Sequence, residues 1–359
     1  MMTFAAVLLA WVVPEPVAME RVRVSDDGRG FVCAGSGRAF TPWGLNYGNA
    51  GRLIEDFWEA EWATVAEDFR EMKALGANVV RVHLQFGKFM EAADRPDPKA
   101  LDRLGRLLEL AEATGVYLDL TGLACYRKAD VPPWYDGLSE ADRWSAQARF
   151  WAAVAARCEA SPAVFCYDLM NEPFAAGGDR KPGDWYSGKT LGGYDFVQWI
   201  ALDPRGRPRE GIARAWIARL TAAIREHDRR HLITVGLLPW VAGWGHLSGF
   251  VPEAVAPGLD FVSVHIYPEK GKVAEAIAIL GRFAAGKPVV VEETFPLACP
   301  ATDLEDFLRR SRGVASGWMG HYDGLSIEQL RDRREKKSLD LAQALYLDWL
   351  VLFRKLAPG

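Results

Sequence analysis

The feature that most constrains the fold is a regular alternation of short apolar runs and longer amphipathic segments from about residue 38 onward. Strands that alternate with helices are joined by right-handed crossovers and therefore run parallel in one sheet. Eight runs are typical of strands: 40–47, 78–86, 116–123, 164–172, 232–238, 261–267, 288–294 and 313–319. Helical periodicity appears between them at 61–75, 99–114, 139–160, 210–228, 272–285 and 303–312, and again at 338–355. The pattern predicts an α/β protein built as a (β/α)8 TIM barrel, with its active site at the carboxyl ends of the strands.

The rival architecture is an open, doubly wound parallel sheet. Such a sheet usually carries a G-x-G-x-x-G turn after its first strand, and "GLNYGNAGR" at 44–52 does not match it. We therefore expect one barrel domain over residues 19–359. The stretch 175–208 lacks helical periodicity, and we expect it to be a long loop over the barrel mouth after the fourth strand.

Composition excludes several classes of protein. The net charge is −4 in 359 residues, and no basic run is interleaved with aromatic residues, so nucleic acid is not an expected partner. Five cysteines without C-x-x-C spacing argue against a disulfide framework and against a zinc site. His227 and His231 lack the H-E-x-x-H arrangement, and we expect them at a solvated helix end. We expect no metal, no cofactor and a monomer.

Two interpretations of the amino terminus remain open. Residues 4–13 form an apolar run of signal-peptide length, too short to span a bilayer. No Lys or Arg precedes that run, however, and "MERVRVSDDGRGFV" from Met19 resembles the start of a domain. Residues 1–18 are thus either a signal-like or disordered segment of a secreted or periplasmic protein, or they precede the true start of a cytoplasmic one.

Polar side chains gather near the carboxyl ends of several predicted strands. Alternate residues of a barrel strand face the lumen and the surrounding helices. Parity directs Arg81 and His83 of the second run and His265 and Tyr267 of the sixth run into the lumen. In the third run it directs Asp119 inward as well, a residue that a buried charged network would explain. Such a network explains His265 and Tyr267 poorly, so these residues indicate a site.

Two glutamates complete the pattern. Glu172 and Glu293 end the fourth and seventh runs, on opposite sides of the expected barrel mouth. Glycoside hydrolysis needs such a pair, one acid to protonate the leaving oxygen and one carboxylate to attack the sugar. Glu292 competes with Glu293 for the second role. Parity places Glu292 on the helix side together with Val290, and this favours Glu293.

These motifs resemble glycoside hydrolase family 5, the cellulase–mannanase family of clan A retaining glycosidases. The resemblance extends over residues 38–325 and implies that Asn171-Glu172-Pro173 holds the acid/base and that Glu293, in "KPVVVEETF", is the nucleophile. It also matches the strand-two arginine of the family to Arg81 and the strand-six His-x-Tyr to His265-Ile266-Tyr267. The expected substrate-binding residues are Asn46, Arg81, His83, Asn171, His265, Tyr267 and Trp318.

The sequence departs from the family at two strand ends. Thr121 stands where many members have a histidine after strand three, and His83 could partly substitute for it. In "GWMGHYD" Trp318 is retained as a floor for the −1 subsite, and His321 stands where a second tryptophan might be. Other tryptophans that follow strands fit sugar stacking and loop packing equally well: Trp134, Trp185, Trp240 and Trp244. Trp62, Trp151 and Trp216 have helical spacing and are expected in the core.

The expected function is a retaining β-glycoside hydrolase acting endo on β-linked glucan or mannan. An exo-acting enzyme for short oligosaccharides or glycoconjugates is the alternative, with the loop 175–208 closing one end of the cleft. A non-catalytic sugar-binding barrel would have lost one carboxylate. A metal-dependent hydrolase or an aldolase would need clustered metal ligands or a strand-end lysine. The sugar, the linkage and the cleavage mode stay open.

Overall fold

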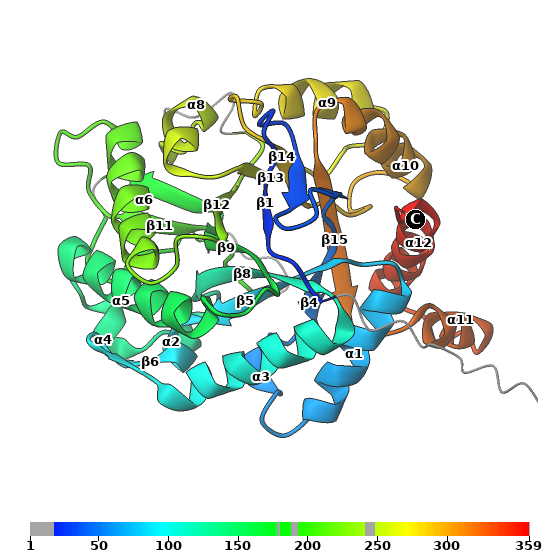
Figure 1. Ribbon diagram of the computed structural model, residues 1–359, viewed down its shortest axis with the longest axis horizontal. Coiled ribbons are helices and arrows are strands. Elements are labelled where there is room, and N and C mark those ends of the chain that lie inside the picture. Colours follow the sequence, from blue (N-terminus) through cyan, green and yellow to red (C-terminus); the bar gives the residue numbers. More distant parts are fainter. Residues whose placement is uncertain are drawn as a thin grey trace, which may run out of the picture.

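A computed structural model describes residues 18–176, 178, 180–186, 188, 193–240 and 248–358. Eight parallel strands close into a barrel at the centre of the molecule (Figure 1). In chain order they are β4 (Trp43–Gly48), β5 (Val79–Gln85), β8 (Tyr117–Ala124), β9 (Val164–Asn171), β12 (Leu232–Leu237), β13 (Val262–His265), β14 (Val289–Glu293) and β15 (Gly317–Asp323). The predicted (β/α)8 TIM barrel is confirmed.

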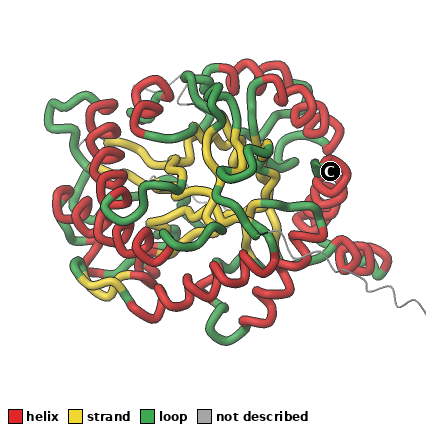
Figure 2. Tube along the Cα trace, viewed as in Figure 1, coloured by secondary structure: helices red, strands yellow, loops and turns green. Residues whose placement is uncertain are grey.

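Helices surround the barrel as a ring (Figure 2). The longer ones are α1 (Trp62–Ala74), α3 (Pro98–Thr114), α5 (Glu140–Cys158), α6 (Arg209–Arg225), α9 (Val273–Gly281), α10 (Ala301–Arg310), α11 (Ile327–Glu335) and α12 (Leu341–Leu356). Short helical turns are α2 (Phe86–Phe89), α4 (Pro133–Asp136), α8 (Pro252–Val255), η1 (Ile54–Asp56), η2 (Lys128–Asp130), η3 (Ala256–Gly258) and η4 (Ser311–Gly313). Local signals set α3: Asp97 accepts hydrogen bonds from the first-turn amides, and Gly115 ends the helix at φ 69°.

A small sheet of β1 (Val22–Val24), β2 (Phe31–Cys33) and β3 (Ala39–Phe40) lies across the barrel, with β1 in front of its centre in Figure 1. Val22 and Phe31 of this sheet pack against the inward residues of the barrel strands. Those inward residues are Val79, Tyr117, Phe165, Cys166, Leu232, Phe261, Val290 and Met319. The amino-terminal part of the lumen is therefore mainly apolar, and the buried charged side chains of the described lumen lie farther along the strands.

The residues in this core confirm which side chains of the second and third strands were predicted to face the lumen. For the seventh strand they show the opposite of the prediction. Val290 faces the lumen, whereas Val289 and Val291 pack with the helices. Glu292 has the same parity as Val290 and also faces inward, so the argument that placed it on the helix side is wrong. The assumed alternation was displaced by one residue, and such a displacement exchanges the two faces of a strand.

The segment after β9 contains more structure than a loop. β10 (Pro173–Ala176) and β11 (Gln198–Ala201) pair in parallel within it. A second pair of short strands, β6 (Met90–Ala92) and β7 (Arg95–Pro96), follows β5. β15 begins at Gly317, four residues later than the predicted start at 313.

His231 is a further correction. It is fully buried, and its Nδ1 lies 2.5 Å from Oδ2 of Asp228, which also accepts a hydrogen bond from the Tyr167 hydroxyl. His231 directly precedes β12 and is part of the core, whereas His227 is exposed as expected.

The signal-like run at 4–13 lies outside the described residues, so the predicted cellular location and the boundary at residue 18 stay predictions, as does the monomer. Among the described helices, none has the length and hydropathy needed to cross a bilayer.

Candidate active site

Arg81 of β5 is the centre of the polar cluster at the carboxyl ends of the strands. Its side chain is fully buried, and Nη1 donates to Glu293 Oε1 at 2.6 Å and to Asn46 Oδ1 at 2.8 Å. Nη2 donates to Asp168 Oδ2 at 2.7 Å and to Asn171 Oδ1 at 3.1 Å. One guanidinium thus joins strands β4, β5, β9 and β14, and it brings together four of the predicted site residues.

Glu293 is held as a carboxylate. Besides Arg81, the Tyr267 hydroxyl donates to its Oε2 at 2.6 Å. Burial acts to raise the pKa of Glu293, but the charges of His265 and Arg81 outweigh it and hold the pKa well below its ordinary value. Glu293 is therefore ionised at neutral pH and can act as a nucleophile.

Glu172 follows β9 and faces Glu293 across the mouth. Its Oε1 lies 2.9 Å from His265 Nδ1, and one of its oxygens lies within 4.8 Å of a Glu293 oxygen. The backbone of Glu172 has φ 46°, a left-handed conformation that costs a non-glycine residue about 1–3 kcal/mol. Its amide donates to the Gly236 carbonyl, which fixes this turn to β12. The predicted pair of carboxylates does meet, although no alternation rule would have predicted the strained turn that presents Glu172.

His265 of β13 lies between acids on both sides. Nδ1 faces Glu172 and lies 3.6 Å from Glu293, and Nε2 lies 3.3 Å from Glu292 Oε2. Burial acts to lower the pKa of His265, but Glu293 and the hydrogen bonds to Glu172 and Glu292 raise it to about 10. His265 is therefore an imidazolium that donates to Glu172 and Glu292 and neutralises part of the negative charge of the site.

Glu292 lies below the pair, fully buried, and accepts a hydrogen bond from Ser263 Oγ at 3.0 Å. The ladder between β13 and β14 shifts register between Val264 and His265, so that His265 pairs with Glu293. This irregularity lets both Glu292 and Glu293 contact the lumen cluster from successive positions. Glu292 supports His265, and Glu293 faces Glu172.

Asp119 and Asp168 complete the buried part of the cluster. Asp168 accepts from Arg81, from Thr121 Oγ1 and from the Gly236 amide, and sequence reasoning did not select it as a site residue. An acid in the middle of the apolar run "VFCYDLMNE" was the available signal. Both oxygens of Asp119 are buried with no donor among the described residues, yet one lies within 4.8 Å of a Glu292 oxygen. Two buried carboxyl groups this close are stable only when they share a proton.

The shared proton belongs to Asp119. Burial and the charge of Glu292 raise the pKa of Asp119 well above its ordinary value. For Glu292, burial acts in the same direction but is outweighed by Arg81 and His265, so its pKa is lowered. A protonated Asp119 can therefore donate toward the Glu292 carboxylate.

His83 lies at the edge of the cluster. Its Nδ1 is 2.6 Å from the hydroxyl of Tyr126, a buried residue just after β8 that the sequence analysis missed. Burial and the charge of Arg81 lower the pKa of His83 well below its ordinary value, which leaves the ring neutral. Thr121 occupies the expected position at β8 and donates to Asp168, so it supports the acid that holds Arg81.

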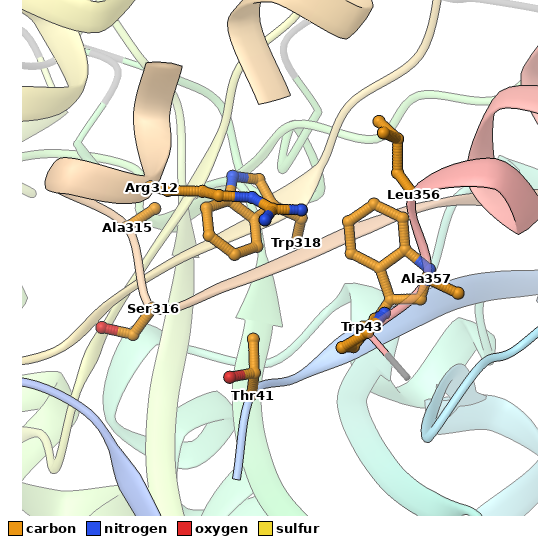
Figure 3. Close-up of a pocket in the computed structure, with 9 residues that line it drawn as sticks. Thr41, Trp43, Arg312, Ala315, Ser316, Trp318, Leu356 and Ala357 are labelled. Carbon is orange, nitrogen blue, oxygen red and sulfur yellow. The ribbon is translucent and has the colours of Figure 1, made fainter. Parts of the chain in front are cut away.

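Trp318 is not part of the site, contrary to expectation. It packs among the outer core residues, donates from Nε1 to Ser311 Oγ at 2.9 Å and lies 6.4 Å from Trp43, ring centre to ring centre. Both indoles line a separate cavity of about 500 Å³ at the amino-terminal end of β4 and β15, beside Arg312 and the end of α12 (Figure 3). Because β15 starts late, Trp318 lies at its amino-terminal end, away from the mouth, and His321 reaches the mouth, where its Nε2 lies 3.0 Å from the Tyr267 hydroxyl.

The other tryptophans divide as follows. Trp185 is buried and donates to the Asp136 carbonyl, and Trp134 packs against Phe86, so both serve the loops. Trp240 is 38% exposed and contacts Phe174, next to the Asn-Glu-Pro turn, and it alone of these three is open to a ligand. Trp244 lies outside the described residues. Trp151 and Trp216 are core residues as predicted, and Trp62 is half-buried.

Two sets of side chains in the described part of the chain have the spacing of metal ligands, Glu172–His265–Glu293 and Asp119–Cys166–Glu292. In the first set Arg81 already pairs with Glu293, and His265 is protonated on both nitrogens. In the second set the shared proton occupies the position between the two acids. Neither set therefore fits a metal well in the protonation state that the surrounding charges favour.

A sequence comparison and a comparison of folds both find known proteins that are similar to this chain. Mannan endo-1,4-beta-mannosidase A of Podospora anserina is 25% identical over 225 residues, which are 55% of this chain and 51% of that protein. The chain thus spans about half the length of this curated relative. Among solved structures, an exo-beta-1,4-mannosidase from Opitutaceae bacterium strain TAV5 superposes with a TM-score of 0.65 at 20% identity, covering 92% of this chain and 62% of that one. An endo-1,4-beta-mannanase from Eisenia fetida has a TM-score of 0.62 at 14% identity, and the match covers 95% of this chain and 96% of that one.

These two structures share the fold. The family follows from the sequence itself, because residues 39–292 match the model of the cellulase family, glycosyl hydrolase family 5, and that span is more than half of the chain. The chain belongs to glycosyl hydrolase family 5.

Proposed function

We propose that this protein hydrolyses β-1,4-linked mannosides with retention of the anomeric configuration. The observation that carries the chemistry is the short separation of Glu172 and Glu293, which bring one oxygen each within 4.8 Å. Retaining glycosidases hold their two carboxyl groups about 5–5.5 Å apart, whereas inverting enzymes leave about 6.5–9.5 Å for a water molecule. The separation supports a covalent intermediate.

Each residue then has a defined part in the double displacement. The Glu293 carboxylate, oriented by Arg81 and Tyr267, attacks the anomeric carbon while Glu172 donates a proton to the leaving oxygen. Glu172 next takes a proton from water, and the resulting hydroxide displaces Glu293 from the sugar. The His265 imidazolium stays close to both side chains, and it stabilises the Glu172 carboxylate that forms once the proton has been given to the leaving oxygen.

Mannose is the sugar that the relatives favour. The curated relative and both compared structures carry names of mannan- or mannoside-cleaving enzymes. We therefore prefer mannan and manno-oligosaccharides over the glucans that the sequence left open.

The cleavage mode is a separate proposal, because one observation favours exo action. Residues 194–198 cross part of the barrel mouth: the Tyr194 hydroxyl donates to the Gly51 carbonyl, the Asp195 amide to the Tyr126 carbonyl, and Asn171 Nδ2 to the Phe196 carbonyl. The Arg127 guanidinium lies over the Tyr194 ring. These contacts join the segments after β4, β8 and β9 and would block a polysaccharide on that side, so release of single sugars from a chain end is favoured over mid-chain cleavage.

The test measures initial rates of wild type, Glu293→Ala and Glu172→Ala on aryl β-mannoside, aryl β-glucoside, and manno- and cello-oligosaccharides. We expect Glu293→Ala to lose roughly 10⁴-fold or more on all substrates. Glu172→Ala should lose most on oligosaccharides, which have poor leaving groups, and least on aryl glycosides. Glu275→Gln, an exposed change on α9, is the matched control and should behave as wild type.

Product analysis decides the remaining points. Proton NMR of early products should show the β-anomer first, and size separation should show mannose as the first product of mannohexaose. A first product with the α-configuration would refute retention. Early products of two or more sugars would refute exo action and leave the double displacement standing.

A further inference from the structure

His321 of β15 stands at a departure from the family pattern, and the structure fixes its ring by packing. The ring lies nearly parallel to that of Tyr267, with centroids 6.2 Å apart and an angle of 16°. Phe295 contacts it edge-on at 5.6 Å, and Trp349 Nε1 donates to the His321 carbonyl at 3.0 Å. The ring therefore has little freedom to turn away from Tyr267.

The hydrogen bonds of Tyr267 determine where the protons lie. Its oxygen is 2.6 Å from Glu293 Oε2 and 3.0 Å from His321 Nε2, and it carries a single hydrogen. A carboxylate can only accept, so the Tyr267 hydrogen must point to Glu293. The Tyr267 oxygen is then an acceptor toward His321, which requires a hydrogen on Nε2 of His321.

The charges around His321 are compatible with a neutral ring. Burial lowers the pKa of His321; the negative Glu293 of β14 opposes this effect, and the positive Arg81 of β5 and His265 of β13 add to it. The other neighbours, Phe295 and Trp349, carry no charge, and Tyr267 keeps its proton because burial and Glu293 raise its pKa well above the ordinary value. A neutral ring with a hydrogen on Nε2 has a lone pair on Nδ1.

We propose that His321 is a positioning residue: as the neutral Nε2–H tautomer it donates to Tyr267 and thereby keeps the Tyr267 hydroxyl directed at Glu293. The role in turnover rests on the proposed glycosidase function, whereas the tautomer does not. Without the Nε2–H donor, the Tyr267 hydroxyl loses the partner that holds it, and Glu293 loses part of the orientation it needs for attack.

The kinetic test compares His321→Gln with His321→Phe on an aryl β-mannoside. Glutamine can place an amide N–H near Nε2 and keep the donor, whereas phenylalanine keeps the ring and removes the donor. We expect His321→Phe to lower kcat about 10- to 100-fold with KM nearly unchanged. A loss of this size is expected when one hydrogen bond within a charged network is removed. His321→Gln should stay within about 3-fold of wild type on the same scale. Equal losses in both variants, or a loss confined to KM, would overturn the positioning role.

The tautomer is tested separately by NMR of ¹⁵N-histidine-labelled wild type. The chain has six histidines, and the His321 signals are assigned by their loss in His321→Gln. Two-bond ¹⁵N–¹H correlations at neutral pH should show a protonated Nε2 and an unprotonated Nδ1. The opposite tautomer, or an imidazolium, would overturn the proposal even if His321→Phe fails to fold. If wild type cleaves no glycoside, the proposed function fails, and the NMR result still decides the state of His321.

Discussion

Replacing Asp119 by asparagine should change how the stability of the protein depends on pH. Asp119 is fully buried, and both carboxyl oxygens lack a donor among the described residues. One of them lies within 4.8 Å of a Glu292 oxygen, which is explained if Asp119 is the protonated partner. Asparagine has nearly the same shape and offers an N–H in place of the O–H, so it can still donate toward Glu292 while the titration is removed.

The sign of the effect follows from the direction of the pKa shift. Asp119 has a raised pKa in the folded protein and titrates near 3.9 when unfolded. Between these two values the folded state binds one more proton than the unfolded state, so the free energy of unfolding falls by up to about 1.4 kcal/mol per pH unit. Asp119→Asn lacks this loss. Relative to wild type it should gain up to about 2.7 kcal/mol between pH 5 and pH 7, as long as Asp119 stays protonated over that range.

The assay is thermal or urea unfolding of both proteins at closely spaced pH values from 4 to 8. The unfolding entropy is about 2.1 cal/mol/K per residue. The difference in melting temperature between Asp119→Asn and wild type should therefore grow by about 2 °C for each pH unit. Asp102→Asn, an exposed change on α3, is the matched control and should run parallel to wild type. A constant difference between Asp119→Asn and wild type would refute the shared proton, because it would mean that Asp119 titrates alike in the folded and unfolded states.

Three further predictions follow from the same geometry. Trp318→Ala should cost about 3–5 kcal/mol in the free energy of unfolding, because Trp318 is a buried core residue; KM for the folded enzyme should be unchanged, and a large rise in KM would instead place Trp318 in a sugar subsite. Gly236→Ala would put a methyl group 2.8 Å from His265 Nε2 and 3.1 Å from Glu292 Oε2. We therefore expect the free energy of unfolding to fall by about 1–3 kcal/mol and kcat to fall as well. Wild-type kinetics in this variant would show that His265 can move freely. The raised pKa of His265, about 10 against an ordinary value of 6.5, means that its stabilising charge is fully present below about pH 6.5 and is lost as the pH rises through 10. His265→Gln should therefore flatten the decline of the unfolding midpoint between pH 7 and pH 10, and an unchanged decline would contradict the imidazolium.

The sequence by itself determined the architecture and most of the candidate site. Period-two apolar runs alternating with helical segments admit few folds, and residues at the carboxyl ends of parallel strands must meet at one end of a closed barrel. Arg81, Asn171, Glu172, His265, Tyr267 and Glu293 were accessible in this way, and the structure brings them together. Arg81, His265 and Tyr267 also required the alternation of their strands, whereas the alternation argument that separated Glu293 from Glu292 was wrong.

The tertiary structure alone decided the residues whose position depends on register. Because β15 starts four residues later than predicted, Trp318 lies at its amino-terminal end, away from the mouth, and His321 reaches the mouth. The irregular pairing of β13 with β14 brought Glu292 and Glu293 into one cluster, although strict alternation allows only one of them inside. The physical reason is that a hydrophobic pattern specifies the two faces of a strand relative to each other. It does not specify where the ladder begins or bulges, because those depend on hydrogen bonds between strands far apart in the sequence.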